Sequence, residues 1–229
     1  MPSICFPRPS AMTTPERRQQ LYSEMLRFMR ANRVNTVPLD IGALCARAGV
    51  ELVPLSQIVR ETGLTEQEVF SIWGNRDGAV NAHGDRHRIA YHDGLPAGRV
   101  RFTICEELAH MVYGHTADAA FNIFSQAYDA EKYAQYDEEA RLGAGLLVCH
   151  PKFYYTYERF LTPRSLAEIC QITLPCARVR REVFIKYRDE IERNMAYQFS
   201  PLPQSRTNLR AYEAAWRRGQ KAGISRRDG

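Results

Sequence analysis

Apolar positions repeat at three- and four-residue spacing over much of the chain, which is the pattern of amphipathic helices. The first repeat predicts a helix from Pro15 to Ala31. Its apolar face consists of Leu21, Met25, Phe28 and Met29. A second helix should begin at Asp40 and end at Gly49, which stands where a left-handed C-cap residue is expected. Further helices are expected near residues 65–73, 99–114, 131–149, 166–170 and 174–191.

Strand-like segments are fewer, and they lie in the first half of the chain. Residues 50–55, VELVPL, form one candidate strand. Between residues 74 and 98 the composition shifts to Gly, Asn, Asp and His, and two β-like runs, GAVNAH and RHRIAYHDG, indicate a small hairpin or sheet edge. The helix of residues 99–114 follows directly. We therefore predict an α+β fold that is mostly helical, with a small sheet beside that helix.

Length and composition are those of a globular protein. With 229 residues and 45% hydrophobic content, the chain can bury a core as one domain with appendages. We divide it into an N-terminal leader and helix at residues 1–35, a main domain at 36–195 and a C-terminal tail at 196–229. No apolar run approaches the roughly 20 residues needed to cross a bilayer, and the first residues lack the apolar segment of a secretory signal. We expect a cytoplasmic protein without a membrane partner.

The net charge of +5 is concentrated in the C-terminal tail, where residues 206–229 hold seven basic and two acidic side chains. The rest of the chain is therefore neutral. A basic tail can bind a nucleic-acid backbone or an acidic partner. Most such charge runs are solvated helices, so we favour that interpretation and keep nucleic acid as an alternative partner. The basic residues are Arg206, Arg210, Arg217, Arg218, Lys221, Arg226 and Arg227.

Residues 106–110, Glu-Glu-Leu-Ala-His, contain the strongest candidate for chemistry. Side chains four positions apart on a helix lie one above the other, so Glu106 and His110 can bind one metal ion while Glu107, rotated by about 100°, reaches a water beside it. The H-E-x-x-H motif of zinc peptidases has this geometry, with two imidazoles on the metal and a glutamate that deprotonates the metal-activated water. Glu106 replaces the first imidazole, and its carboxylate suits Zn²⁺ or Mn²⁺. A surface Glu pair beside a core histidine is the competing interpretation.

A third protein ligand is expected from the predicted helix that carries YDEEARLGAGLLVCHP. Asp137 lies on a stripe of small apolar residues that can pack against a neighbouring helix. Glu139, on the next stripe, is the second candidate, whereas Glu138 should be exposed. His115 follows His110 by five positions, about 140° around a continued helix, so we expect it to be exposed or in a loop. The six cysteines include no C-x-x-C pair, which argues against a thiolate zinc site.

Four blocks of the chain carry a resemblance to a known family. Residues 101–110, RFTICEELAH, look like the R-F-T-x-A-H-E-L-G-H block of the ImmA/IrrE metallo-endopeptidases. Residues 89–91, IAY, lie where that family has its I-x-Y/V-N strand, and residues 139–147, EARLGAGLL, are similar to its E-A-N-x-F-A-A-x-L-L helix. Residues 166–180 resemble its closing I-A-x-x-F-x-V-S-x-x-A-A-x-x-R segment. The resemblance covers about residues 40–187.

The resemblance implies a zincin-like fold for residues 36–195, a divalent metal, usually zinc, and proteolysis of a protein target. That target is typically a DNA-binding repressor whose cleavage induces a mobile element or a stress response. The resemblance makes His110 a metal ligand and Glu107 the general base, and it places Asp137 at the acidic third-ligand position. Glu106 departs from the first histidine, as in E-E-L-G-H versions associated with phages and mobile elements, and Asp137 replaces the usual Glu. The alternative is a degenerate member that binds a repressor or regulates transcription without cutting.

Overall fold

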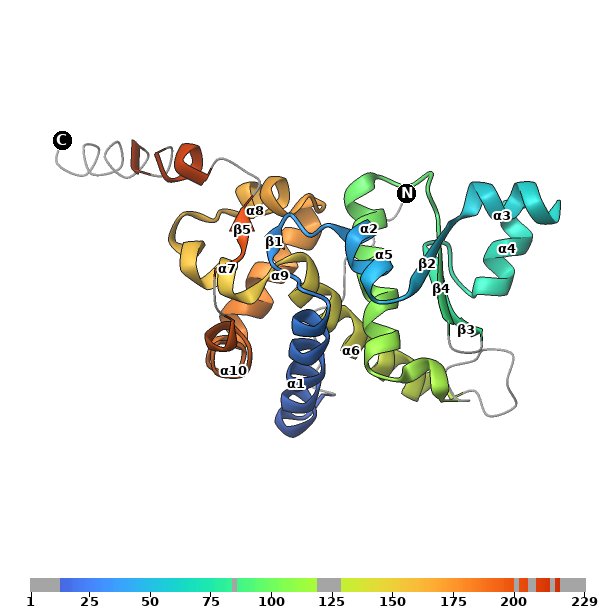
Figure 1. The fold of residues 1–229 in the computed structure, drawn as a ribbon, viewed down its shortest axis with the longest axis horizontal. Helices are drawn as coiled ribbons and strands as arrows, with labels where there is room; N and C mark the ends of the chain where they lie inside the picture. The colour runs from blue at the N-terminus through green and yellow to red at the C-terminus, as the bar shows by residue number, and fades with distance from the viewer. Residues whose placement is uncertain are drawn as a thin grey trace.

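Two long helices in contact, α5 (Ala97–Val112) and α6 (Ala130–Val148), form the centre of the fold. The computed structural model describes residues 13–83, 86–118, 129–199, 202–205, 209–214 and 217–218. Small residues let the two helices approach closely, because a Cβ added to Gly143 of α6 would lie 2.8 Å from the Cβ of Ala109 on α5. The small sheet lies on one side of this pair and the C-terminal helices lie on the other (Figure 1).

The sheet has three strands in the order β2 (Val50–Pro54), β4 (Arg86–Tyr91) and β3 (Gly78–His83). Strands β2 and β4 are parallel, whereas β3 and β4 form the predicted antiparallel hairpin, in which Val80 is opposite Ile89. Helix α5 packs against β3 and β4, and Ile89 is fully buried. These elements confirm the predicted α+β fold with a small sheet beside α5. Within the described sheet, β3 is an edge strand.

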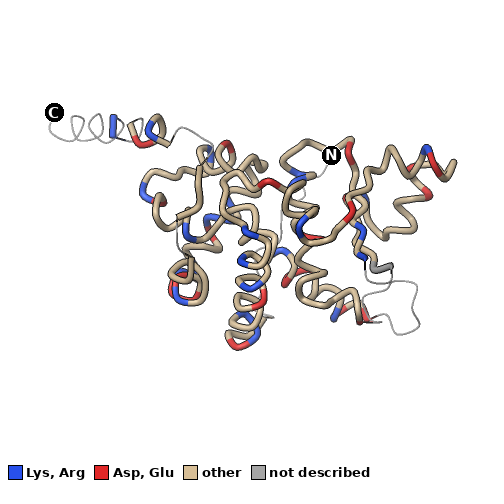
Figure 2. Tube along the Cα trace, viewed as in Figure 1, with Lys and Arg blue, Asp and Glu red and all other residues tan. Residues whose placement is uncertain are grey.

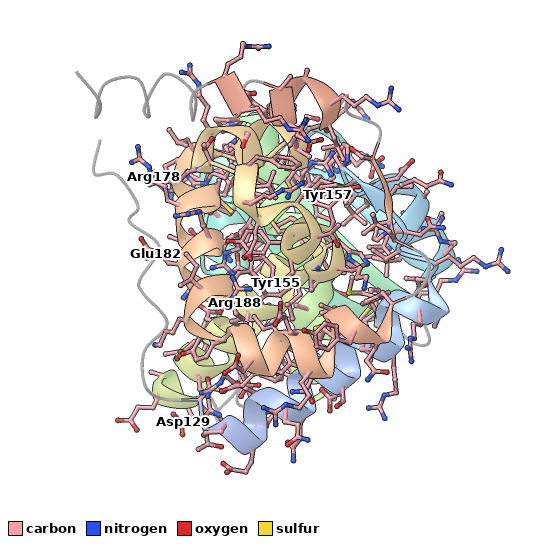
Figure 3. The ribbon with its side chains drawn as sticks, turned by 90° about the vertical axis from the view of Figure 1, so that its left-hand side faces the viewer. Asp129, Tyr155, Tyr157, Arg178, Glu182 and Arg188 are labelled. Atoms are coloured by element: carbon pink, nitrogen blue, oxygen red, sulfur yellow. The ribbon has the colours of Figure 1, made fainter. Side chains whose placement is uncertain are left out.

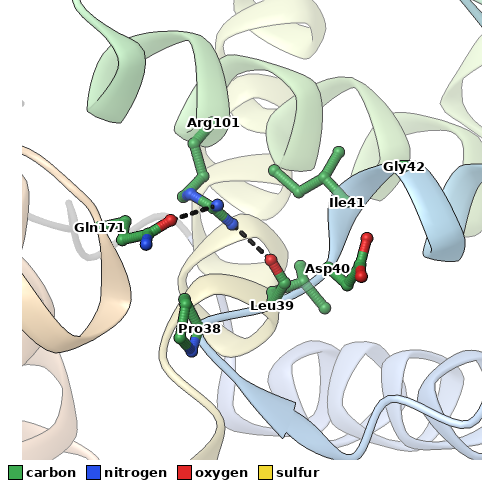
Figure 4. A pocket seen from close by; sticks show the side chains of 7 residues that line it. All are labelled: Pro38, Leu39, Asp40, Ile41, Gly42, Arg101 and Gln171. Carbon is green, nitrogen blue, oxygen red and sulfur yellow. Dashed lines mark hydrogen bonds between the residues drawn. The ribbon is translucent and has the colours of Figure 1, made fainter. Parts of the chain in front are cut away.

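The start of α2 (Ile41–Arg47) is joined to α5 around a pocket of about 390 Å³ (Figure 4). Asp40, where the helix was expected to begin, caps α2, with its side chain accepting a hydrogen bond from a backbone amide of the first turn at 3.1 Å. Arg101 projects from α5 and donates to the Leu39 carbonyl at 2.6 Å and to the side-chain oxygen of Gln171 at 2.8 Å. The Arg101 guanidinium therefore links α5 to two segments that lie far from it in sequence.

Two short helices, α3 (Leu55–Thr62) and α4 (Glu66–Trp73), follow β2. Helix α4 lies where a helix was expected and begins with a capping box, in which the Thr65 side chain accepts from the Glu68 amide and the Glu68 side chain accepts from the Thr65 amide. Helix α3 was not predicted, because the residues around Pro54 have the pattern of a strand. Pro54 ends β2 and is also the N-cap residue of α3.

The N-terminal helix α1 (Pro15–Ala31) has the bounds that the sequence predicts, and it packs against α6 and α10 (Arg188–Asn194). Three residues of its predicted apolar face are fully buried, namely Leu21, Met25 and Met29. They belong to the same hydrophobic core as the buried residues of α5 and α6. Helix α1 therefore docks on the centre of the fold.

The C-terminal half also contains α7 (Pro151–Tyr157), α8 (Pro163–Cys170) and α9 (Leu174–Lys186). The single helix predicted for residues 174–191 is wrong, because the chain breaks at Tyr187 (φ −111°, ψ 29°) between α9 and α10. Neither glycine nor proline stands at the break. Instead, side chains on both sides of it pack against other helices. The Arg18 guanidinium lies 4.5 Å from the centre of the Tyr187 ring, and Arg188 lies 5.1 Å from that of Tyr155 (Figure 3). Helix α7 was also not predicted.

Basic and acidic residues are interspersed along the described helices (Figure 2), in agreement with a neutral main body. Most of the predicted basic tail, residues 206–208, 215–216 and 219–229, lies outside the described residues. Just before it, β5 (Gln204–Ser205) forms a short parallel pair with β1 (Thr36–Val37). In the part of the chain that the structure describes, no helix combines the length and the apolar character needed to cross a membrane.

Replacing Gly143 with alanine should lower the free energy of unfolding by about 1–3 kcal/mol, because the contact between α5 and α6 has no room for a methyl group. The added Cβ would lie 2.6 Å from Tyr113 Oη and 2.8 Å from Ala109 Cβ. Gly42→Ala is the matched control, since its nearest neighbour would be 3.9 Å away. The control should be neutral or stabilising by up to about 1 kcal/mol. Urea denaturation measures both variants, and equal effects would contradict the tight helix contact.

Candidate metal centre

Helix α5 presents Glu106, Glu107 and His110 to two neighbours, α6 and the sheet. Glu107 and His110 are buried, whereas Glu106 is partly exposed. The four-residue spacing places Glu106 and His110 on the face that meets α6. Glu107 is rotated away from that face, and its carboxylate contacts β3 instead. One helix therefore supplies an acid and an imidazole to α6 and a second acid to the sheet edge.

Asp137 on α6 lies opposite His110, with its Oδ1 atom 3.6 Å from His110 Nε2. The contact between α5 and α6 thus brings together Glu106, His110 and Asp137, three of the predicted metal ligands. Two carboxylates and one imidazole form a donor set that Zn²⁺ accepts, and carboxylate ligands also suit Mn²⁺.

Arg141, one turn after Asp137 on α6, lies between the two carboxylates of this group. Its Nε atom is 3.1 Å from Glu106 Oε1, and one of its terminal nitrogens is 3.1 Å from Asp137 Oδ2. The guanidinium is therefore a cation shared by two of the predicted ligands. The Arg141 backbone carbonyl accepts a hydrogen bond from the buried Arg180 at 2.8 Å, which fixes α6 at this turn.

Sequence reasoning did not single out Arg141, although a signal for it was present. In the E-A-N-x-F-A-A-x-L-L block that the chain resembles, asparagine stands where this chain has Arg141. Glu106 is also a departure, since the resembling block has histidine there. Arg141 and Glu106 are opposite in charge and form an ion pair. Their complementarity could have been noticed from sequence, but their contact could not.

The donor chemistry of the group fits a divalent ion, but the ligands do not yet surround one point. Arg141 demonstrates that a positive charge can contact Glu106 and Asp137 at the same time. Among the described residues, no three His, Cys, Asp or Glu side chains are arranged as a complete ligand set. Metal binding therefore requires the Arg141 side chain, which is 31% exposed, to turn away from the two acids.

Burial shifts the protonation of this cluster toward its neutral forms. Burial, reinforced by the charge of Glu106, raises the pKa of Glu107 to about 8. Burial, opposed by the charge of Arg141, raises the pKa of Glu106 to about 7. Burial, followed by the charges of His115 and Arg141, lowers the pKa of His110 to about 3. Neutral imidazole is the form that binds metals, and a nearby cation favours ionised carboxylates.

Glu107 accepts a hydrogen bond at 2.9 Å from the backbone amide of Val80 on β3. Val80 is opposite Ile89 in the hairpin, yet its amide donates to Glu107 and thus points away from β4. The Glu107 carboxylate therefore lies against the outer edge of β3, where an extended peptide could pair with the sheet.

Glu139 has a different set of partners. Its carboxylate accepts hydrogen bonds from Arg17 at 3.0 and 2.5 Å and from Gln135 at 3.1 Å, and it lies 3.1 Å from His115 Nε2. Burial acts to raise the pKa of Glu139, but hydrogen bonds from His115, Arg17 and Gln135 outweigh it and lower the pKa to about 2. These four contacts occupy the acceptor positions of a carboxylate. Asp137 is thus the acid of α6 that faces His110.

His115 is only 2% exposed, so the expectation that it is exposed is wrong. The prediction assumed that the helix continues. Instead α5 ends at Val112, Gly114 adopts φ 73°, and the chain turns into the short 3₁₀ helix η1 (His115–Ala117). The turn brings His115 Nδ1 to 3.0 Å from His110 Nδ1.

Comparison with protein families matches the part of the chain that contains these residues. The family model described as IrrE N-terminal-like domain, Peptidase_M78, matches residues 67–172. That range contains β3, β4, α5 and α6, and with them Glu106, Glu107, His110, Asp137 and Arg141. Comparisons with curated proteins and with solved structures found no significant match. The match over residues 67–172 supports membership of the ImmA/IrrE family of metallopeptidase-type proteins, and the α+β fold is consistent with a zincin-like domain of that family.

Proposed function

We propose that the protein is a metal-dependent endopeptidase that cleaves a regulatory protein of the repressor type. In this proposal Glu106, His110 and Asp137 hold the metal, and Glu107 is the general base. The observation that carries it is that Glu106, His110 and Asp137 meet where α5 packs on α6, while the neighbouring Glu107 reaches the edge of β3, all inside the region that matches the IrrE-like domain.

Glu106, His110 and Asp137 would hold a divalent ion, zinc or manganese, which would supply Lewis acidity for the hydrolysis. Glu107 takes the proton from the attacking water and later gives it to the leaving amine. Its position on α5 is buried, and the hydrogen bond from Val80 fixes the carboxylate at the edge of β3. The same burial reduces the contact of the Glu107 carboxylate with bulk water, which strengthens its electrostatic interactions.

The substrate would bind as an extended strand along the outer edge of β3. This edge is adjacent to the base, since the Val80 amide on it already contacts Glu107. Backbone hydrogen bonds to β3 would place a peptide carbonyl beside Glu107 without a deep side-chain pocket. A substrate recognised in this way must be unfolded or extended locally, as in a linker or a flexible segment of a repressor.

A proteolysis assay with added metal tests the function directly. The protein is stripped with a chelator, loaded with Zn²⁺ or Mn²⁺ and incubated with a library of extended peptides and with candidate repressors. Mass spectrometry then identifies new termini. We expect cleavage that requires metal, disappears with chelator and returns when the metal is restored. A fully metal-loaded protein that cuts neither library peptides nor repressors would contradict the proposal.

Arg141 also favours a second candidate, a degenerate member that binds its partner without cutting it. In that case the guanidinium permanently neutralises Glu106 and Asp137 and replaces a metal as the structural cation of the site. Affinity for a partner repressor would then be the same with chelator and with saturating Zn²⁺. A loss of partner affinity in chelator would argue against this candidate.

A further inference from the structure

A chain of hydrogen bonds, buried over its first two links, runs from His110 to the N-terminal helix. His110 Nδ1 lies 3.0 Å from His115 Nδ1, and His115 Nε2 lies 3.1 Å from Glu139 Oε2. Glu139 in turn pairs with Arg17 of α1 through two hydrogen bonds of 3.0 and 2.5 Å. Four side chains from α1, α5, η1 and α6 thus form one connected path that ends on the proposed metal ligand.

The middle of this path is held firmly. The side chain of His115 is 1% exposed and that of Glu139 is 0% exposed. The Tyr136 ring stacks on the His115 ring, with centroids 4.1 Å apart and planes inclined by 13°. Gln135 gives Glu139 a further hydrogen bond at 3.1 Å. A ring that is stacked on one face and bonded through both nitrogens cannot easily reorient.

The path also has a direction. Glu139, paired with Arg17 as a carboxylate, only accepts hydrogen bonds, so His115 Nε2 must carry a proton. A neutral His115 then has its lone pair on Nδ1, where it accepts from His110. The proton of a neutral His110 therefore resides on Nδ1, and its lone pair is on Nε2, the nitrogen that faces Asp137.

We propose that Arg17, Glu139 and His115 are positioning residues that fix His110 in the ring form with its lone pair on Nε2, the form that binds a metal ion. The inference rests on the proposed function, because it takes His110 to be a ligand. Metal-binding histidines commonly donate their second ring nitrogen to a carboxylate or a carbonyl group. Here a second histidine is inserted between the ligand and the carboxylate. Arg17 lies outside the matched residues 67–172, so α1 contributes to the site of the family domain.

Three substitutions at His115 separate positioning from simple packing. His115→Asn keeps an acceptor near the position of Nδ1, His115→Gln keeps a donor near that of Nε2, and His115→Phe keeps only the ring. In metal-free, ¹⁵N-histidine-labelled protein, nitrogen shifts report which ring nitrogen of His110 carries the proton. We expect His110 to be protonated on Nδ1 in wild type and in His115→Asn. In His115→Gln and His115→Phe we expect a mixture of the Nδ1- and Nε2-protonated forms. The same mixture in all three folded variants would overturn the inference.

The outer end of the path has a matched control on the same helix. Arg17→Gln removes the partner of Glu139, whereas Arg18→Gln removes an equally close bidentate pair with Glu190 on α10 that does not touch the path. Titration with Zn²⁺ against a chromophoric chelator should give about 10- to 100-fold weaker binding for His115→Phe. Arg17→Gln should weaken binding by roughly 3- to 10-fold, and Arg18→Gln should not change it. Equal affinities for Arg17→Gln and Arg18→Gln would contradict the role of α1.

The two readouts keep this inference separable from the proposed function. If wild-type protein binds no divalent metal, the peptidase proposal fails, yet the protonation of His110 in metal-free protein still decides whether the path orients the ring. If metal binds normally while His110 is a mixture of ring forms in wild type, the positioning inference fails and the metal centre stands.

Discussion

Replacing Glu107 with glutamine should reduce peptide cleavage by about 10²- to 10⁴-fold, because the amide cannot take a proton from the attacking water. The substitution is nearly isosteric, and the glutamine oxygen can still accept the hydrogen bond from the Val80 amide. Folding and metal content should therefore stay at wild-type levels. Initial rates on a peptide identified by mass spectrometry, with metal content measured in the same samples, check the prediction.

The control is Glu182→Gln, an acid-to-amide change at an exposed position of α9 (Figure 3). It should leave the rate unchanged. Cleavage at the wild-type rate in Glu107→Gln would show that Glu107 is not the general base. A loss of metal in this variant would indicate that Glu107 is a ligand.

Replacing Arg141 with asparagine should strengthen metal binding by roughly 100-fold. In the present conformation a metal competes with two charge-assisted contacts of the guanidinium, to Glu106 and to Asp137, each contributing about 1.5 kcal/mol. Asparagine removes that competitor and is the residue found in the family block that the chain resembles. Without metal, the two acids lose their shared cation, so the variant should be less stable than wild type.

Titration of metal-free protein with Zn²⁺, together with thermal unfolding in chelator and in Zn²⁺, measures both effects of Arg141→Asn. Arg178→Asn is the matched control, since it removes the same charge from an exposed position of α9 (Figure 3). The control should bind metal like wild type. Unchanged affinity in Arg141→Asn, with both acids still in place, would mean that the guanidinium does not compete with a metal.

Local signals in the sequence were sufficient for the elements that form the site. The apolar spacing of α1, the Asp40 cap, the Thr65 capping box and the β3–β4 hairpin all follow from residues close to one another in the chain. The four-residue spacing also placed Glu106 and His110 on one face of α5. Such features depend on short-range geometry, which the order of residues determines directly.

Features that depend on contacts between distant segments were not predictable in the same way. Gly114, with φ 73°, turns the chain back, and His115 is buried as a result. The position of His115 on a continued helix, about 140° from His110, had predicted an exposed side chain. The pairing of Arg17 with Glu139 joins residues 122 positions apart, and no local pattern marks it. Arg141 had a sequence signal in its departure from asparagine, but only the packing of α5 on α6 shows that it meets Glu106.

The most direct test of the metal centre is a crystal structure of the protein soaked with Zn²⁺, with anomalous diffraction measured at the zinc edge. We expect one strong anomalous peak about 2.0–2.2 Å from a carboxylate oxygen of Glu106, from His110 Nε2 and from a carboxylate oxygen of Asp137, with the Arg141 side chain turned away. A map without such a peak, in which Arg141 still bridges Glu106 and Asp137 at saturating Zn²⁺, would contradict this expectation.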